Sequence, residues 1–151
     1  MHSPDDHTYL RRAFAAARTA RAAGDRPFGA VLVRDGQAAW TARNRQNTAG
    51  DPSAHAELVL LREACAAVGA GALRGATVYA SGEPCAMCAG ALFWAGVARI
   101  VYGAPTPEIE ARLGGPRLGL RCADVLAGAQ PPVAVEGPVL PDKALAALQS
   151  S

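Results

Sequence analysis

Two short stretches of the sequence carry side chains that bind metals and transfer protons. His55 and Glu57 stand one residue apart in the first, and the second reads Pro84-Cys85-Ala86-Met87-Cys88. Zinc prefers imidazole and thiolate ligands, and a catalytic zinc ion keeps a fourth position open for water. We therefore predict that His55, Cys85 and Cys88 hold one Zn²⁺ ion per chain, with a bound water, and that Glu57 lies beside it.

This group of side chains suits one class of hydrolysis. Zinc lowers the pKa of a bound water to about 7, and one carboxyl group beside that water can move all the protons that the reaction needs. Glu57 would take a proton from the water, pass it to a ring nitrogen and then assist the loss of ammonia. The order H-x-E followed by P-C-x-x-C is known from zinc-dependent nucleobase deaminases. The sequence thus predicts hydrolytic deamination of a heterocycle, with Glu57 as the catalytic residue.

Two non-catalytic interpretations of the Cys-x-x-Cys pair remain as alternatives. A structural zinc site needs four ligands, whereas the other two cysteines, Cys65 and Cys122, stand alone and are predicted to be buried or loop thiols. A redox pair would leave His55 and Glu57 unexplained. A zinc-stabilised structural domain is therefore kept as the non-enzymatic alternative.

The first stretch must lie at the start of a helix. Residues spaced i and i+2 point apart in mid-helix, so His55 and Glu57 can face one cavity only if a helix begins at or just before His55. We predict that this helix covers residues 54–68, with Ser53 as its N-cap. Its predicted inner face consists of Leu58, Leu61, Cys65 and Val68.

The two thiols are predicted to lie at the start of a second helix. Pro84 suits the first turn, where its missing N–H costs nothing, and the helix is expected to run to about Ala95. Cys85 and Cys88 are three residues apart, so both thiols would share one helix face, and the helix dipole favours thiolate there. Glu83, just before Pro84, is either a loop acid or an anchor that fixes the loop by hydrogen bonds.

The remaining pattern is that of an α/β domain. A helix over residues 5–23 would place Leu10, Ala13, Phe14 and Ala17 on one apolar stripe. Predicted strands cover 28–33, 37–43, 77–80, 100–102 and 133–135, a hairpin turn lies at Asp35-Gly36, and further helical segments cover 109–113 and 142–149. This order predicts a sheet covered by helices on its faces, in one domain of residues 1–151.

Composition limits the partners and the location. The net charge is only +2, and the arginines are scattered along the chain, which argues against a large nucleic-acid partner. No signal peptide or membrane span is visible. We therefore expect a cytoplasmic protein without a membrane partner, in which the cysteines stay reduced.

The motifs resemble the cytidine/deoxycytidylate deaminase-like superfamily of zinc enzymes, above all its bacterial guanine deaminases and tRNA-specific adenosine deaminases. The resemblance runs from about Tyr9 to Gly103. It is carried by Pro27-Phe28-Gly29-Ala30-Val31-Leu32-Val33, Asn44, Asp51-Pro52-Ser53-Ala54-His55-Ala56-Glu57, Glu83-Pro84-Cys85-Ala86-Met87-Cys88-Ala89-Gly90-Ala91 and Val101-Tyr102-Gly103. It implies a three-layer α-β-α fold around a five-stranded mixed sheet, and a homodimer or larger assembly.

The resemblance also implies contacts to a small-molecule substrate. It maps the side-chain amide of Asn44, which by position alone is a turn residue, to a hydrogen bond with the base edge. It maps the backbone N–H of Ala56 to a second contact. Phe28 is a further candidate contact, although a core position is the simpler interpretation.

Two features favour a free nucleobase over tRNA. Phe93-Trp94-Ala95 resembles the segment of guanine deaminases in which a tryptophan packs near the base; the alternative for Trp94 is a core aromatic. Residues 142–151 carry one lysine, where the tRNA enzymes tend to have a basic helix. Guanine deaminases also have an acid after the fourth strand, for which Glu108 or Glu110 is the candidate. Guanine is the leading prediction; adenosine in a tRNA anticodon loop, cytosine or another pyrimidine, a pterin and a triazine are alternatives.

Overall fold

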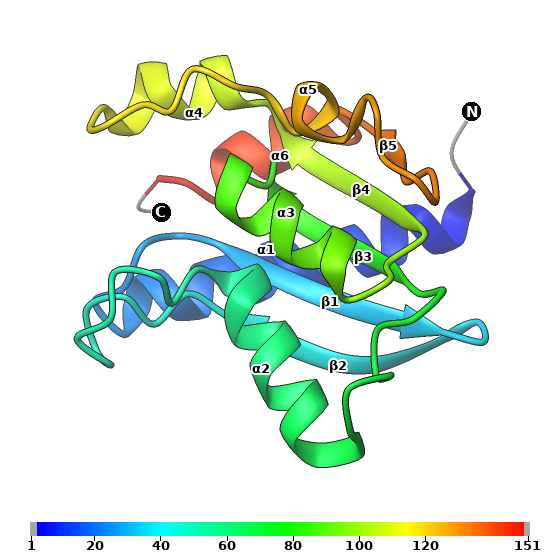
Figure 1. Ribbon diagram of the computed structural model, residues 1–151. Coiled ribbons are helices and arrows are strands. Elements are labelled where there is room, and N and C mark those ends of the chain that lie inside the picture. The colour runs from blue at the N-terminus through cyan, green and yellow to red at the C-terminus, as the bar shows by residue number, and fades with distance from the viewer. Residues whose placement is uncertain (1–2, 150–151) are drawn as a thin grey trace.

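A five-stranded mixed sheet forms the middle layer of the computed structural model, which describes residues 3–149 (Figure 1). The strand order is β2-β1-β3-β4-β5. Strand β1 pairs antiparallel with β2 and β3, whereas β4 pairs parallel with β3 and β5. The strands are β1 (Gly29–Arg34), β2 (Gln37–Arg43), β3 (Thr77–Gly82), β4 (Arg99–Ala104) and β5 (Ala134–Glu136).

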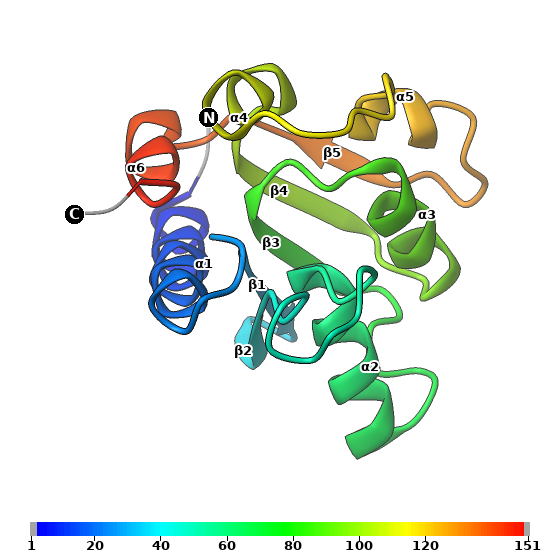
Figure 2. The same ribbon diagram turned by 90° about the vertical axis from the view of Figure 1, so that its left-hand side faces the viewer.

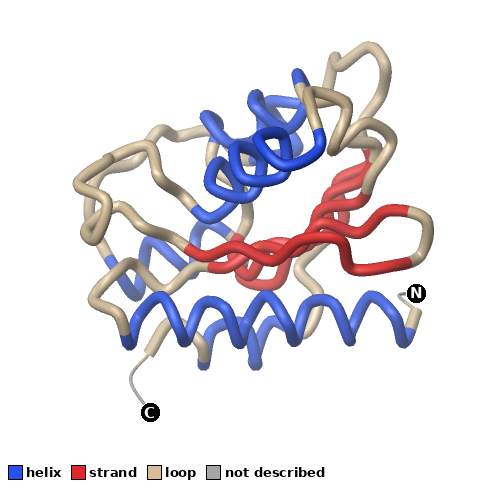
Figure 3. The backbone as a smooth tube through the Cα atoms, turned by 90° about the horizontal axis from the view of Figure 1, so that it is seen from below, coloured by secondary structure: helices blue, strands red, loops and turns tan. Residues whose placement is uncertain are grey.

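Helices cover both faces of the sheet, which confirms the predicted three-layer fold. Helices α1 and α6 lie on one face, and α2, α3 and α5 lie on the other (Figure 2). The long helix α1 runs beneath the sheet in the view of Figure 3. The helices are α1 (Pro4–Ala22), α2 (Ala56–Val68), α3 (Ala86–Trp94), α4 (Thr106–Leu113), α5 (Cys122–Leu126) and α6 (Pro141–Ala146). Within residues 3–149, none of these helices has the length and apolar character needed to cross a bilayer.

The strands separate two apolar cores because alternate side chains point to opposite faces of a sheet. Leu32 and Val78 pack in the core that includes α2 and α3. Val31 and Val101 pack in the core that includes α1 and α6. The predicted stripe of α1 is buried in that second core, as Leu10, Ala13, Phe14 and Ala17.

Helix α2 begins later than predicted, and its buried face is different. Its N-cap is His55 rather than Ser53, and the His55 side chain makes no capping hydrogen bond. The predicted inner face is wrong at its end, because Leu61 and Cys65 are half-buried and Val68 is 67% exposed. The buried positions are Ala56, Glu57, Leu58, Val59, Leu60 and Ala64. Nine of the thirteen residues of α2 are alanine, leucine or valine, so the helix carries several apolar stripes of the same spacing, and packing against the sheet selects one of them.

Other boundaries also differ from the prediction. Helix α3 has Cys85 as its N-cap, so Pro84 precedes the helix instead of forming its first turn. Helix α4 is longer than the predicted turn over 109–113, α5 was not predicted, and α6 ends before residue 149. Helix α4 buries none of its residues. Its partly buried Ile109 and Leu113, four residues apart, pack against the core of α1 and α6, and this pair alone indicates no more than one helical turn.

A charged network ties α1 to the amino end of β4. The Asp6 carboxylate, which is 4% exposed, accepts hydrogen bonds from the Tyr79 hydroxyl at 2.5 Å and from Nη2 of Arg99 at 2.8 Å. Arg99 also donates from Nε to Glu136 in β5 at 2.6 Å. The hydrogen bonds from Arg99 hold the pKa of Asp6 well below its usual range. The network thus fixes one end of the sheet, at a distance from residues 55 and 85.

Candidate zinc centre and pocket

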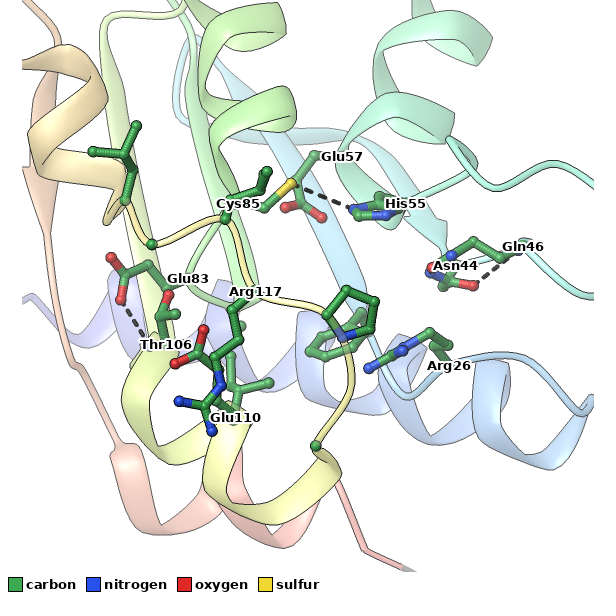
Figure 4. A pocket seen from close by; sticks show the side chains of 18 residues that line it. Arg26, Asn44, Gln46, His55, Glu57, Glu83, Cys85, Thr106, Glu110 and Arg117 are labelled. Carbon is green, nitrogen blue, oxygen red and sulfur yellow. Dashed lines mark hydrogen bonds between the residues drawn. The ribbon is translucent and has the colours of Figure 1, made fainter.

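The predicted metal ligands meet where two helices begin, and Figure 4 shows two of them, His55 and Cys85, side by side. His55 is the N-cap of α2 and Cys85 is the N-cap of α3. Cys88 lies in the first turn of α3 and is fully buried. Strands β2 and β3 both run antiparallel to β1. Their carboxyl ends therefore lie at the same end of the sheet. The helices that follow them therefore start side by side.

The three ligand atoms fit a zinc ion. Nδ1 of His55 lies 3.6 Å from Sγ of Cys85 and 3.6 Å from Sγ of Cys88, and all three atoms lie within 4.8 Å of one another. Zinc bonds of about 2.0 Å to nitrogen and 2.3 Å to sulfur, at a tetrahedral angle, place such atoms about 3.6 Å apart. Among residues 3–149, no fourth histidine, cysteine or acid joins the group. The set matches a catalytic site with one open position.

The three ligand side chains differ in how readily they lose the proton that a zinc ion would replace. The hydrogen bond from Cys88, together with His55, lowers the pKa of Cys85 to about 4. The same hydrogen bond, with burial, raises the pKa of Cys88, and the hydrogen bond to Cys85 raises that of His55. Zinc must therefore displace the proton of the Cys88 thiol when it binds and competes with protons for His55, so its affinity falls with falling pH.

Glu57 is the second residue of α2, and its carboxylate faces the ligand side chains (Figure 4). This start of the helix meets the condition under which His55 and Glu57 can share a cavity. Glu57 is 6% exposed. Its burial, and then the charge of the nearby Cys85 thiolate, raise its pKa to about 7. A carboxyl group of this pKa can both take up and release a proton near neutral pH.

His55, Cys85 and Glu57 line a cavity of about 320 Å³, and Cys88 lies buried behind it. One wall comes from the loops that flank β1 and β2, and the opposite wall comes from α4 and the loop after it. The lining residues are Arg26, Phe28, Asn44, Gln46, His55, Glu57, Gly82, Glu83, Cys85, Thr106, Ile109, Glu110, Gly114, Pro116, Arg117, Leu118, Gly119 and Leu120.

The amide of Asn44 is held at the cavity wall. Asn44 is 1% exposed, its Oδ1 accepts the N–H of Gln46 at 2.9 Å, and its Nδ2 donates to Oε1 of Gln46 at 2.7 Å. A carboxamide has two N–H groups and two acceptor lone pairs. One donor and one acceptor of Asn44 therefore remain for a ligand, although the residue also shapes its own turn.

Comparison with known proteins decides the family. The family model for the cytidine and deoxycytidylate deaminase zinc-binding region matches residues 3–104. The chain belongs to this family. The match includes all three zinc ligands and Glu57, so this is a domain of the zinc-dependent deaminase type. It ends before residues 106–120, which form one wall of the cavity.

Relatives of this chain are named for different substrates. A tRNA-specific adenosine deaminase of Bacillus subtilis is 42% identical over 103 residues, which are 68% of this chain and 64% of that protein. A guanine deaminase of Bacillus subtilis is 43% identical over 98 residues, 64% of this chain and 63% of that protein. The chain thus spans less than two thirds of either relative. The solved guanine deaminase of Nitrosomonas europaea is 26% identical, has a TM-score of 0.83, and is matched over 98% of this chain and 84% of its own.

Two predicted substrate contacts of the deaminase lie outside the cavity. Trp94 is 84% exposed and packs edge-on against Phe93, with ring centroids 5.0 Å apart. It lies six residues after Cys88, about 9 Å further along α3 at 1.5 Å per residue, so the ring lies neither in the cavity nor in the core. Glu108 also points elsewhere, because α4 turns Ile109 and Glu110 toward the cavity.

Other predicted contacts are close to the site. Phe28 and Asn44 line the cavity. Ala56 is fully buried, and its N–H, at the first position of α2, has no partner within the helix. Contact of these groups with a substrate stays a prediction. For Glu83, the anchoring interpretation is correct, since its carboxylate accepts the backbone N–H of Thr106 at 2.8 Å.

The lining residues that were not predicted from the sequence include Arg26, Gln46 and Arg117. The guanidinium of Arg26 lies over the ring of Phe28, 5.8 Å from its centroid, and Gln46 bonds to Asn44. Arg26 and Gln46 each lie within two positions of a recognised motif, and this proximity is the signal by which the sequence could have indicated them. Arg117 follows Gly114, Gly115 and Pro116 in a segment without regular structure, and no local pattern indicates that it reaches the cavity.

Proposed function

We propose that this chain catalyses the zinc-dependent hydrolytic deamination of a small free nucleobase, with guanine as the leading candidate. The observation that carries the proposal is the buried Glu57 carboxylate, beside three ligand atoms, in a cavity of about 320 Å³. Cavities near this size enclose small heterocyclic ligands. The relatives that act on guanine support the choice of base.

The chain's own groups supply the proton transfers. When bound, zinc supplies a Lewis acid that makes water ionise near neutral pH. Glu57 takes a proton from the attacking water and delivers it to the ring nitrogen as the C–O bond forms. It then takes the remaining proton of the added hydroxyl and passes it to the amine, so that the C–N bond breaks, ammonia leaves and a carbonyl remains. Its buried position excludes bulk water from these transfers.

The cavity wall offers a matching set of groups for a purine edge. The free donor and acceptor of Asn44 can pair with ring nitrogens or a carbonyl. The Glu110 carboxylate, on the opposite wall, can accept hydrogen bonds from ring N–H and amino groups. We assign Glu110, rather than Glu108, to recognition of the base.

The test is ammonia release by the zinc-loaded protein from a panel of free bases and nucleosides that includes guanine, adenine, cytosine, a pterin and an aminotriazine. Turnover of guanine or another free base supports the proposal, and the zinc-loaded Glu57→Ala variant is the matched control. Ammonia release from none of the panel would overturn it. A zinc-stabilised structural domain, the non-enzymatic alternative, predicts that outcome for wild type and variant alike.

The 42% identity to the Bacillus subtilis tRNA enzyme favours a second candidate, deamination of adenosine in a tRNA anticodon loop. This candidate predicts inosine in an anticodon stem-loop RNA, at a rate that falls steeply with salt because phosphate contacts release counterions. The described C-terminal helix α6 has one basic residue, Lys143, beside Asp142. Turnover of a free base that is insensitive to salt counts against this candidate.

We further propose that the chain works as a homodimer. Helix α3 exposes Met87 (39%) and Trp94 (84%), and large exposed apolar side chains that cluster on one element are typical of interaction surfaces. Light scattering coupled to size-exclusion chromatography measures the mass directly. A monomeric mass at micromolar concentration, unchanged by zinc, contradicts this assignment.

A further inference from the structure

Glu83 occupies a central place between the zinc ligands and one wall of the cavity. It follows the last residue of β3 and precedes Cys85 by two positions. Its side chain is only 1% exposed. A buried carboxylate must find donors for its oxygens or remain protonated, and the donors of Glu83 all come from the segment 106–122.

The hydrogen bonds of Glu83 join both ends of that segment. The N–H of Thr106, the first residue of α4, donates to Oε1 at 2.8 Å. The N–H of Cys122, the first residue of α5, donates to Oε2 at 3.0 Å. The guanidinium of Arg121 adds donations from Nη2 at 2.9 Å and from Nε at 3.1 Å. One carboxylate therefore holds the two ends of the segment together.

The middle of the segment has little support of its own. Residues 114–121 have no regular secondary structure and are exposed, with Leu118 at 67% and Leu120 at 53%. Among the described residues, none from 115 to 120 donates a hydrogen bond to a backbone carbonyl. Yet this stretch supplies Pro116, Arg117 and Leu118 to the cavity wall. Its position over the cavity thus depends on how its ends are held.

We propose that Glu83 is a positioning residue for substrate binding, which through Thr106, Arg121 and Cys122 holds the segment 106–122 against the cavity. Glu83 lies at the cavity wall, but both of its carboxylate oxygens already accept hydrogen bonds from the segment, so its role is to position other groups. It keeps Glu110 and the 116–120 stretch at the distance at which they enclose the base. Loosening this attachment weakens substrate binding and leaves the zinc ligands and Glu57 in place. Only the predicted changes in KM and kcat rest on the proposed function; the predicted attachment of residues 106–122 does not.

The substitution Arg121→Met tests it in the full-length, zinc-loaded protein. Arg121 is partly exposed, with 44% of its side chain accessible, so the variant is expected to fold. Loss of the charge-assisted hydrogen bonds predicts faster amide hydrogen exchange in residues 106–122, and a KM raised roughly five- to thirty-fold. We expect kcat to change less than threefold and the zinc content to stay at one per chain. Arg121→Lys, which keeps one donor, restores part of both effects.

The matched control is Arg99→Met, which removes an arginine from another buried carboxylate, Asp6, at the amino end of β4. It is expected to lower overall stability without changing exchange in residues 106–122 or KM. Unchanged exchange and KM in Arg121→Met would overturn the inference, and so would an equal rise of KM in Arg99→Met. If no substrate is found, the exchange measurement alone still decides whether Glu83 holds the segment, so failure of the proposed function is distinguishable.

Discussion

Replacing Glu57 by glutamine separates proton transfer from metal binding. The two side chains have nearly the same shape, and Glu57 does not belong to the group of three residues that could hold zinc. Glutamine cannot take up and release a proton. We therefore expect kcat/KM to fall by ~10²–10⁴, a loss of about 3–5 kcal/mol of transition-state stabilisation, while the zinc content is unchanged.

The same substitution is expected to stabilise the metal-free protein at alkaline pH. Burial raises the pKa of Glu57 from its ordinary 4.5 to about 7, so between these values the unfolded chain gives up a proton that the folded chain retains. Stability is therefore unaffected by this group below pH 4.5 and falls as pH rises through 7. The difference between the two pKa values corresponds to at most about 3 kcal/mol, a loss that the glutamine variant does not suffer.

Two assays test these expectations together. Ammonia release and metal analysis of the zinc-loaded Glu57→Gln variant measure activity and zinc content, and urea unfolding of the metal-free proteins at pH 4.5 and 8.5 measures stability. The control is Glu110→Gln, at a half-buried position of the same cavity, which we expect to raise KM without changing metal-free stability. The reasoning is refuted if Glu57→Gln keeps a tenth of the activity, loses its zinc, or is less stable than the wild type at pH 8.5.

Three further substitutions probe other parts of the molecule. Cys88→Ser replaces a fully buried thiol by a poor zinc ligand, and metal analysis after dialysis against a weak chelator should find less than about a tenth of the wild-type zinc; full retention would exclude Cys88 as a ligand. Asp6→Asn leaves Tyr79 without a charged acceptor and takes from Arg99 one of its two carboxylate partners, the other being Glu136, and should lower the free energy of unfolding by about 2 kcal/mol at pH 7. Because the pKa of Asp6 in the folded protein lies below its ordinary 3.8, this contribution to stability is present above about pH 4 and lost below it. The free energies of unfolding of variant and wild type, measured with urea, should therefore become equal in acid. Asn44→Ala should raise KM about tenfold with zinc content unchanged, and steady-state kinetics with an unchanged KM would remove Asn44 from the binding site.

The sequence by itself was enough to determine the reacting groups. His55 and Glu57 can face one cavity only at a helix start, and Cys85 and Cys88 share a face because three residues make nearly one helical turn. These relations depend on local backbone geometry alone. Together with the known motif order H-x-E and P-C-x-x-C, they led to the ligand set, the neighbouring carboxylate and the zinc-deaminase family, and short apolar runs were enough to locate most strands of the sheet.

Only the tertiary structure decided what surrounds these groups. The inner face of α2, the exposure of Trp94 and the choice of Glu110 over Glu108 depend on how whole elements pack. The attachment of residues 106–122 to Glu83 joins groups 23 to 39 positions apart. Contacts between segments so far apart in the chain have no spacing rule that a sequence can display. The proposed reaction therefore follows from local pattern, whereas the wall that would face a substrate is set by packing.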